Sequence, residues 1–125
     1  MSTPATLAGM LFVLTVNGEA FDVALEDNAA AQALVDRLPL AVSMKELNGN
    51  EKYADLAKPL PAAEQSVGRI SAGDLMLWGD DCLVLFYKSF RTPYRYTRLG
   101  RVVNPASLKA AVGAGSVRIE LKRGR

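Results

Sequence analysis

The sequence predicts a mainly β protein: an antiparallel β-barrel of about eight short strands, closed or nearly closed, with two short helices covering its ends. Turn residues separate short apolar runs along the chain, two pairs of runs form hairpin patterns, and only two segments have helical spacing. The 125 residues are 50% hydrophobic and 22% charged, which fits one packed domain over residues 1–125 and excludes a disordered or disulfide-stapled chain.

The first hairpin is predicted from the dipeptide Asn17-Gly18, which lies between two strand patterns. Both residue types tolerate a positive φ, and a two-residue type I′ turn requires that at both positions. In the second arm, alternate residues from Phe21 to Leu25 are apolar, which is typical of a strand with one buried face. We therefore predict strands over residues 11–16 and 19–25.

A short helix and another strand are predicted next. Asp27 or Asn28 provides an N-cap, apolar residues recur at helical spacing over 29–38, and Pro39 ends the pattern. Residues 40–47 favour a strand that stops at an Asn-Gly-Asn turn.

The second hairpin is predicted over residues 74–78 and 82–87, around a Gly-Asp-Asp turn. Its arms are nearly continuous apolar runs, which indicates burial on both faces and a place at the centre of the core. The proline-containing segment 58–68 before it is typical of a loop.

The remaining pattern predicts a strand, a helix and a closing strand. The first strand spans 94–103, after which Asn104 caps a short helix that has Pro105 at its first position. This helix ends near Val112, and residues 117–121 alternate as the last strand.

Composition excludes several kinds of active site. The chain has no histidine and one cysteine, Cys82, so neither a Ser-His-Asp or Cys-His nucleophile nor a His- or Cys-based zinc site can form within it. Asp74, Asp80 and Asp81 are explained by turn geometry, and the glycines near 113–115 lack the context of a phosphate loop. We expect no metal and no cofactor.

The thiol count and the start of the chain bear on location. A lone cysteine suits a reducing compartment, and no basic stretch precedes the apolar run 7–16 as it would in a signal sequence. We therefore expect a cytoplasmic protein that does not cross a membrane.

Charge is divided unevenly along the chain. Residues 1–81 carry 12 acids and 5 bases, whereas residues 82–125 carry 10 bases and one acid, Glu120. One interpretation is an anion-binding face, and the other is that the two halves interleave on an ordinary surface. Because the pI of 8.8 falls short of that of typical nucleic-acid modules, we expect no nucleic-acid partner.

Several segments resemble a known family. Residues 12–19, Phe-Val-Leu-Thr-Val-Asn-Gly-Glu, are similar to the opening of cyclophilins, whose barrel has eight antiparallel strands and a helix over each end. Residues 38–40, 44–53, 73–76, 83–87 and 99–102 resemble the small bacterial cyclophilin-like domain family. The resemblance extends over nearly the whole length and implies a cyclophilin-like barrel.

The resemblance also implies a function to be tested. Active cyclophilins isomerise the bond before proline with an arginine donor and an apolar pocket. Here Ser43-Met44-Lys45 stands where their Phe-His-Arg triplet is expected, and a lysine lacks the planar fork of a guanidinium. We expect a binding protein without conventional prolyl isomerase activity. The alternative is an isomerase whose remodelled site uses Arg91, Arg95 or Arg98 as donor.

The expected ligand is a peptide or a small molecule, held at the open mouth of the barrel. Aromatic and basic residues of the segment 87–98, together with nearby apolar side chains, combine flat surfaces with forked donors. A third hypothesis is an interaction module or homo-oligomer that uses the basic face. The candidate ligand-binding residues are Met44, Tyr53, Met76, Trp78, Phe86, Arg91, Tyr94, Tyr96 and Arg98.

Overall fold

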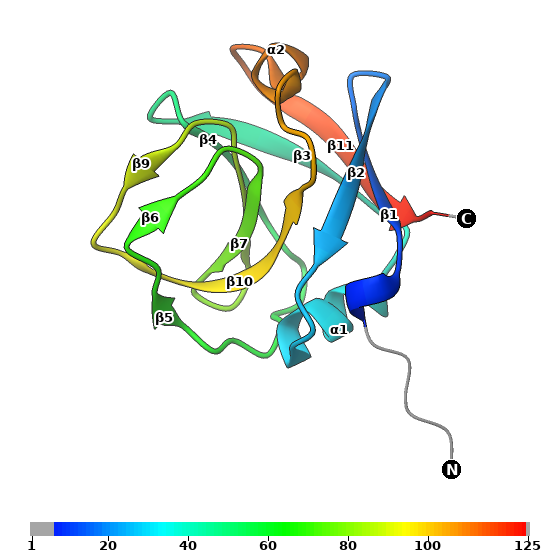
Figure 1. Cartoon of the computed structure of the whole chain (residues 1–125), viewed down its shortest axis with the longest axis vertical. Helices are drawn as coiled ribbons and strands as arrows, with labels where there is room; N and C mark the ends of the chain where they lie inside the picture. The colour runs from blue at the N-terminus through cyan, green and yellow to red at the C-terminus, as the bar shows by residue number, and fades with distance from the viewer. Residues whose placement is uncertain (1–6, 125) are drawn as a thin grey trace.

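Backbone hydrogen bonds connect eight antiparallel strands into a closed ring in this computed structural model, which describes residues 7–124 (Figure 1). In spatial order the ring consists of β2 (Glu19–Leu25), β1 (Phe12–Val16), β11 (Val117–Arg123), β3 (Leu40–Leu47), β4 (Glu51–Asp55), β8 (Cys82–Phe86), β7 (Asp74–Trp78) and β10 (Arg95–Val102). Pairing of β10 with β2 closes the ring. The predicted barrel is confirmed, although no strand had been expected at β4.

Two short helices lie at opposite ends of the molecule in Figure 1: α1 (Ala29–Val35) and α2 (Leu108–Val112). A 3-10 turn, η1 (Leu7–Gly9), precedes β1. The predicted N-cap of α1 is confirmed, since Asn28 Oδ1 accepts a hydrogen bond from the Ala31 amide at 2.8 Å. Asn28 Nδ2 also donates to the Arg98 carbonyl at 2.8 Å, which joins this helix to β10. The helix ends at Val35, before the predicted stop at Pro39.

The predicted start of the second helix is wrong. Asn104 Oδ1 accepts from the Ala106 amide at 3.4 Å within a turn, and α2 begins only at Leu108, after Ser107. Asn104 therefore stabilises the turn before the helix. The predicted end near Val112, before Gly113, is confirmed.

Three two-residue strands were not predicted: β5 (Gln65–Ser66), β6 (Arg69–Ile70) and β9 (Phe90–Arg91). The segment predicted as a loop over 58–68 contains β5, which extends the sheet beyond β10. Strands β6 and β9 pair with each other and form a small ribbon on one side of the barrel (Figure 1).

The wall formed by β7 and β8 is buried on both faces, as the continuous apolar runs predicted. One set of alternate residues, Leu75, Leu77, Leu83 and Leu85, belongs to the main core inside the barrel. The other set points outward into a second cluster that consists of Ile70, Met76, Val84, Phe86 and Tyr96, with Tyr53, Val67, Cys82 and Phe90 packed against it. The barrel thus has an apolar outer face at this wall.

No helix within residues 7–124 combines the length and the apolar composition that crossing a membrane requires.

Candidate ligand pocket on the outer barrel wall

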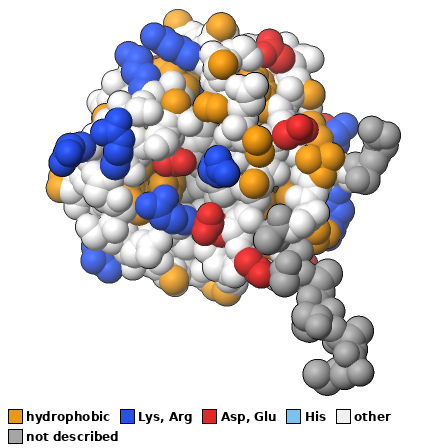
Figure 2. All heavy atoms as spheres, in the orientation of Figure 1, with side chains coloured by type: hydrophobic (Ala, Val, Ile, Leu, Met, Phe, Trp, Pro, Cys, Tyr) orange, Lys and Arg blue, Asp and Glu red, His pale blue; other side chains and the backbone are white. Residues whose placement is uncertain are grey.

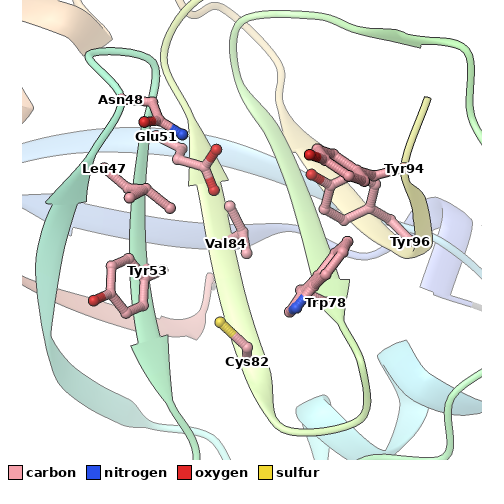
Figure 3. A pocket seen from close by; sticks show the side chains of 9 residues that line it. All are labelled: Leu47, Asn48, Glu51, Tyr53, Trp78, Cys82, Val84, Tyr94 and Tyr96. Carbon is pink, nitrogen blue, oxygen red and sulfur yellow. The ribbon is translucent and has the colours of Figure 1, made fainter. Parts of the chain in front are cut away.

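A pocket of about 430 Å3 opens beside the second apolar cluster (Figure 3). It lies on the outer face of the wall and not at the mouth of the barrel, where the sequence had led us to expect a site. Its lining consists of Leu47, Asn48, Glu51, Tyr53, Trp78, Cys82, Val84, Tyr94 and Tyr96.

Strand register explains how these side chains reach one surface. Directly opposed residues of an antiparallel pair project from the same face of a sheet. Leu47 is opposite Glu51, Tyr53 is opposite Val84, and Trp78 is opposite Cys82. Four neighbouring strands therefore contribute to one outward surface, and β10 adds Tyr96.

Aromatic rings form one side of the pocket. The Trp78 ring lies 5.4 Å from the Tyr94 ring in an edge-to-face arrangement and 5.4 Å from the Tyr96 ring at a tilt of 57°. Trp78 is 45% exposed and Tyr94 57% exposed, although both are large and largely apolar. Contiguous exposed apolar surface of this kind marks binding sites in folded proteins.

The opposite side carries Glu51 and Tyr53, with Val84 and Cys82 between the two sides (Figure 3). Glu51 is only 9% exposed. Its burial, together with the charge of Glu46, raises the pKa of the Glu51 carboxyl above its ordinary value. The pocket therefore contains a carboxylate that water solvates poorly.

The surroundings of Cys82 and Tyr96 in the pocket also disfavour negative charge. Burial, followed by the charges of Asp55, Asp81 and Glu51, raises the pKa of the Cys82 thiol to about 11. Burial and the Glu51 charge raise the pKa of Tyr96 to about 12. Both groups are neutral at physiological pH, and the surroundings of the pocket disfavour additional negative charge.

Lys52, the neighbour of Glu51 in sequence, points away from the pocket. Its Nζ donates to the carbonyls of Gly113 at 2.8 Å and Gly115 at 2.5 Å and lies 3.0 Å from Glu46 Oε1. The Tyr87 hydroxyl donates to the same Glu46 oxygen at 2.7 Å. This network joins the buried Lys52 and Tyr87 to the half-buried Glu46, holds the β3–β4 hairpin next to its turn, and occupies the ammonium fully.

The structure divides the nine candidate residues into groups. Tyr53, Trp78, Tyr94 and Tyr96 line the pocket. Met76 and Phe86 are buried in the outer cluster, and the Phe86 ring lies 5.6 Å from the Tyr96 ring.

The remaining three candidates do not line the pocket. Met44 lies in the main core inside the barrel. Arg91 is exposed on β9, opposite Arg69, and Arg98 is opposite Met76 on β10. Neither arginine is thus among the residues that line the pocket, although the register places Arg98 on the same outward face as Met76 and Tyr96.

Sequence reasoning missed Leu47, Asn48, Glu51, Cys82 and Val84 as lining residues. A signal for Glu51 was present, because Leu47, Glu51 and Tyr53 share a face once the Asn-Gly turn fixes the hairpin register. No such signal existed for Val84, because both faces of β8 are apolar.

The arrangement suits binding more than covalent chemistry. The thiol of Cys82 is held protonated, and no hydroxyl or amine of the lining is paired with a base. Within residues 7–124, no three His, Cys, Asp or Glu side chains are grouped so that they could hold a metal ion. The pocket offers apolar and aromatic contact together with one carboxylate.

Comparison with known proteins defines the family. The Cyclophilin-like family profile matches residues 14–122. The solution structure of a hypothetical protein from Archaeoglobus fulgidus superposes with a TM-score of 0.62 at 19% identity, covering 98% of this chain and 100% of that one. No curated protein shows significant similarity. The superposition with the archaeal protein shows a shared fold. The profile match over most of the length shows that this chain belongs to the cyclophilin-like family.

Proposed function

We propose that this protein is a ligand-binding member of the family, which takes a small organic molecule or a peptide side chain into the outer pocket and does not isomerise prolyl bonds. The observation that carries the proposal is the pair of exposed rings Trp78 and Tyr94, packed with the buried Tyr96 ring beside a cavity of about 430 Å3. That volume lies within the range of small-molecule sites.

The positions of the arginines support binding over isomerisation. An isomerase with a remodelled site needs a guanidinium directed at the bound prolyl nitrogen. Arg91 and Arg98 do not line the pocket, and Arg95 Nη2 donates to the Glu64 carbonyl at 2.9 Å. A proline ring could enter the aromatic pocket, but no lining residue would supply a guanidinium.

Location and partners remain predictions. The lone cysteine still favours the cytoplasm, and a peptide or small molecule remains the expected partner. A homo-oligomer is the alternative partner that the basic face leaves open.

The test uses one NMR experiment on a short X-Pro peptide, with and without a catalytic amount of the protein. We expect either peptide shifts or no effect, and in both cases no acceleration of cis/trans exchange. Acceleration that disappears when Arg91, Arg95 or Arg98 is replaced would overturn the proposal in favour of the isomerase.

A fragment titration tests the binding itself. Trp78 is the only tryptophan of the chain, so its emission reports directly on the pocket wall. We expect apolar fragments to change that emission, and NMR to show loss of binding in Trp78→Ala. Val103→Ala is the matched control, because Val103 is exposed and lies outside the pocket. Equal binding by both variants would place the ligand elsewhere.

A further inference from the structure

The charges around the pocket indicate what kind of ligand it takes. Of the nine lining residues, Glu51 is the one that carries a formal charge at neutral pH, and no lysine or arginine is among them. The nearest base in sequence, Lys52, is bonded to Glu46 and to two carbonyls on the other face of the strand. The Glu51 carboxylate therefore has no cationic partner within the pocket.

An apolar or anionic occupant would stabilise this carboxylate less than water does. An apolar molecule would remove its remaining solvent without replacing it, and burial of an unpaired charge is strongly unfavourable. An anion would add direct repulsion, strengthened by the acids Asp55 and Asp81 that surround Cys82. Only a cationic occupant supplies the positive charge that the Glu51 carboxylate lacks.

The aromatic side of the pocket favours the same occupant. The faces of tyrosine and tryptophan rings attract cations through the ring quadrupole, most strongly at desolvated sites, and aromatic cages recognise quaternary ammonium groups in this way. Figure 3 shows the rings of Trp78, Tyr94 and Tyr96 across the hollow from Glu51 and Tyr53. A compact cation between the two sides would meet both aromatic surface and the carboxylate.

We propose that the pocket selects an organic cation, an ammonium group with small apolar substituents, held between the Trp78, Tyr94 and Tyr96 rings and the Glu51 carboxylate. This inference rests on the proposed function, because it names the ligand class of the same site. It assigns Glu51 as the residue that determines charge specificity and the rings as the surface that excludes water.

The test compares three probes of the same shape and different charge: choline, the neutral 3,3-dimethyl-1-butanol, and the anion 3,3-dimethylbutanoate. Affinities are measured by Trp78 emission and by NMR shifts. We expect choline to bind at least about tenfold more tightly than the neutral probe, and the anion to bind least. Equal binding of choline and the neutral probe would overturn the cation inference while preserving the apolar ligand site. Failure of all three probes would also overturn it, and the fragment titration would then decide whether the site binds at all.

Variants show whether Glu51 is responsible. Glu51→Gln keeps the shape and removes the charge, so it should reduce the preference for choline to the part that the rings supply, and it should strengthen binding of the neutral probe, which no longer buries a carboxylate. Glu120→Gln makes the same change on β11, outside the pocket, and should have no effect. A preference that is undiminished in Glu51→Gln would contradict the assigned role.

The pH dependence gives an independent readout. Choline keeps its charge at every pH, so a change in its affinity reports on the protein. Burial raises the pKa of Glu51, so choline affinity should increase as the pH rises through that value and should stay constant in Glu51→Gln. A flat profile in the unaltered protein would contradict the proposal.

Discussion

Lys52 has 0% exposed surface, and it is the one fully buried basic side chain within residues 7–124. A buried ammonium is tolerated only when charge and hydrogen bonds replace its lost hydration. Glu46, two backbone carbonyls and the Tyr87 ring, whose centroid is 5.5 Å from Nζ, do so here. The network joins β3 and β4 to the loop after α2, and it stabilises the strand that presents Glu51.

Removal of the Lys52 ammonium should therefore destabilise the barrel where β3 and β4 meet the loop after α2. We expect Lys52→Met to lower the free energy of unfolding by about 3–5 kcal/mol, because Glu46 and the carbonyls of Gly113 and Gly115 lose their shared partner. Urea denaturation measures the change. Lys45→Met is the matched control, since Lys45 is exposed on the same hairpin. A loss no larger than that of the control would show that the network contributes little.

Cys82 reports on the electrostatics of the pocket without any ligand. Because its pKa is about 11 rather than 9.0, its thiolate fraction at neutral pH should be about a hundredth of that of an unshielded thiol. We expect iodoacetamide to alkylate it correspondingly slowly in the folded protein and at the normal rate in denaturant.

The acids near Cys82 provide the variants for this measurement. After burial, Asp55 contributes most to the raised pKa of the thiol, so Asp55→Asn should accelerate alkylation. Asp22→Asn, an exposed change on β2, should not. Equal rates in the two variants would mean that burial alone protects the thiol.

At the scale of the elements, the seam between β10 and β2 depends on Gly100. The register of β10 against β7 shifts between Arg98 and Gly100, and Gly100 pairs with Leu25 where the ring closes. A Cβ at this position would overlap the carbonyl oxygen of Ala24 and press on Leu25. No side chain fits unless the two strands separate.

We therefore expect Gly100→Ala to cost about 1–3 kcal/mol of stability, the usual range for overpacking. Gly115→Ala is the control, because a Cβ there would meet open space. Amide exchange of Glu26, whose N–H donates to the Leu99 carbonyl at 2.8 Å, should increase in Gly100→Ala. Unchanged exchange and stability would show that the seam can accommodate a methyl group.

Local chemistry explains which elements the sequence could predict. The strands and hairpins around Asn17-Gly18 and Gly79 depend on turn residues and period-2 patterns that lie within a few positions. The two-residue strands β5, β6 and β9 carry no such pattern, and they form only where the fold brings their partners alongside. Asn104 was assigned to the wrong role because a turn and a helix cap use the same side-chain bond.

The candidate site was only partly predictable for a related reason. Aromatic residues are candidates in any sequence because ligand sites are rich in them, and four of those named here line the pocket. Where both faces of a strand are apolar, as in β7 and β8, the pattern does not show which face points inward, so it did not show that Met76 lies outside the barrel wall. Met44, on β3, lies inside the barrel.

At the scale of the whole molecule, the acidic and basic parts of the chain do not neutralise each other in pairs. Within residues 7–124 the one ion pair is Glu46–Lys52, and both residues belong to the acidic part. Figure 2 shows Lys and Arg side chains gathered over the side that carries β6 and β9, with few acids among them. There the exposed Arg69 and Arg91 are directly opposed.

Such a surface should make stability depend on salt in a definite direction. Like charges that face each other across a strand pair are destabilising, and salt screens this repulsion over about 8 Å at 0.15 M. Salt would lower Tm by weakening ion pairs between exposed side chains, but residues 7–124 contain no such pair. A rise from about 0.01 M to about 0.5 M NaCl should therefore raise Tm.

Arg91→Ser separates this face from the general effect of net charge. At low salt it should increase the free energy of unfolding by about 0.2–1 kcal/mol and so raise Tm. It should also make Tm depend less on the salt concentration. Lys109→Ser removes one exposed charge from α2 at the far end and should leave the salt dependence nearly unchanged. If the two variants respond equally, net charge and not the opposed arginines governs the effect. If Tm falls with salt, attractive pairing between the two parts of the chain outweighs repulsion within the basic face, and the opposed arginines do not set the salt response.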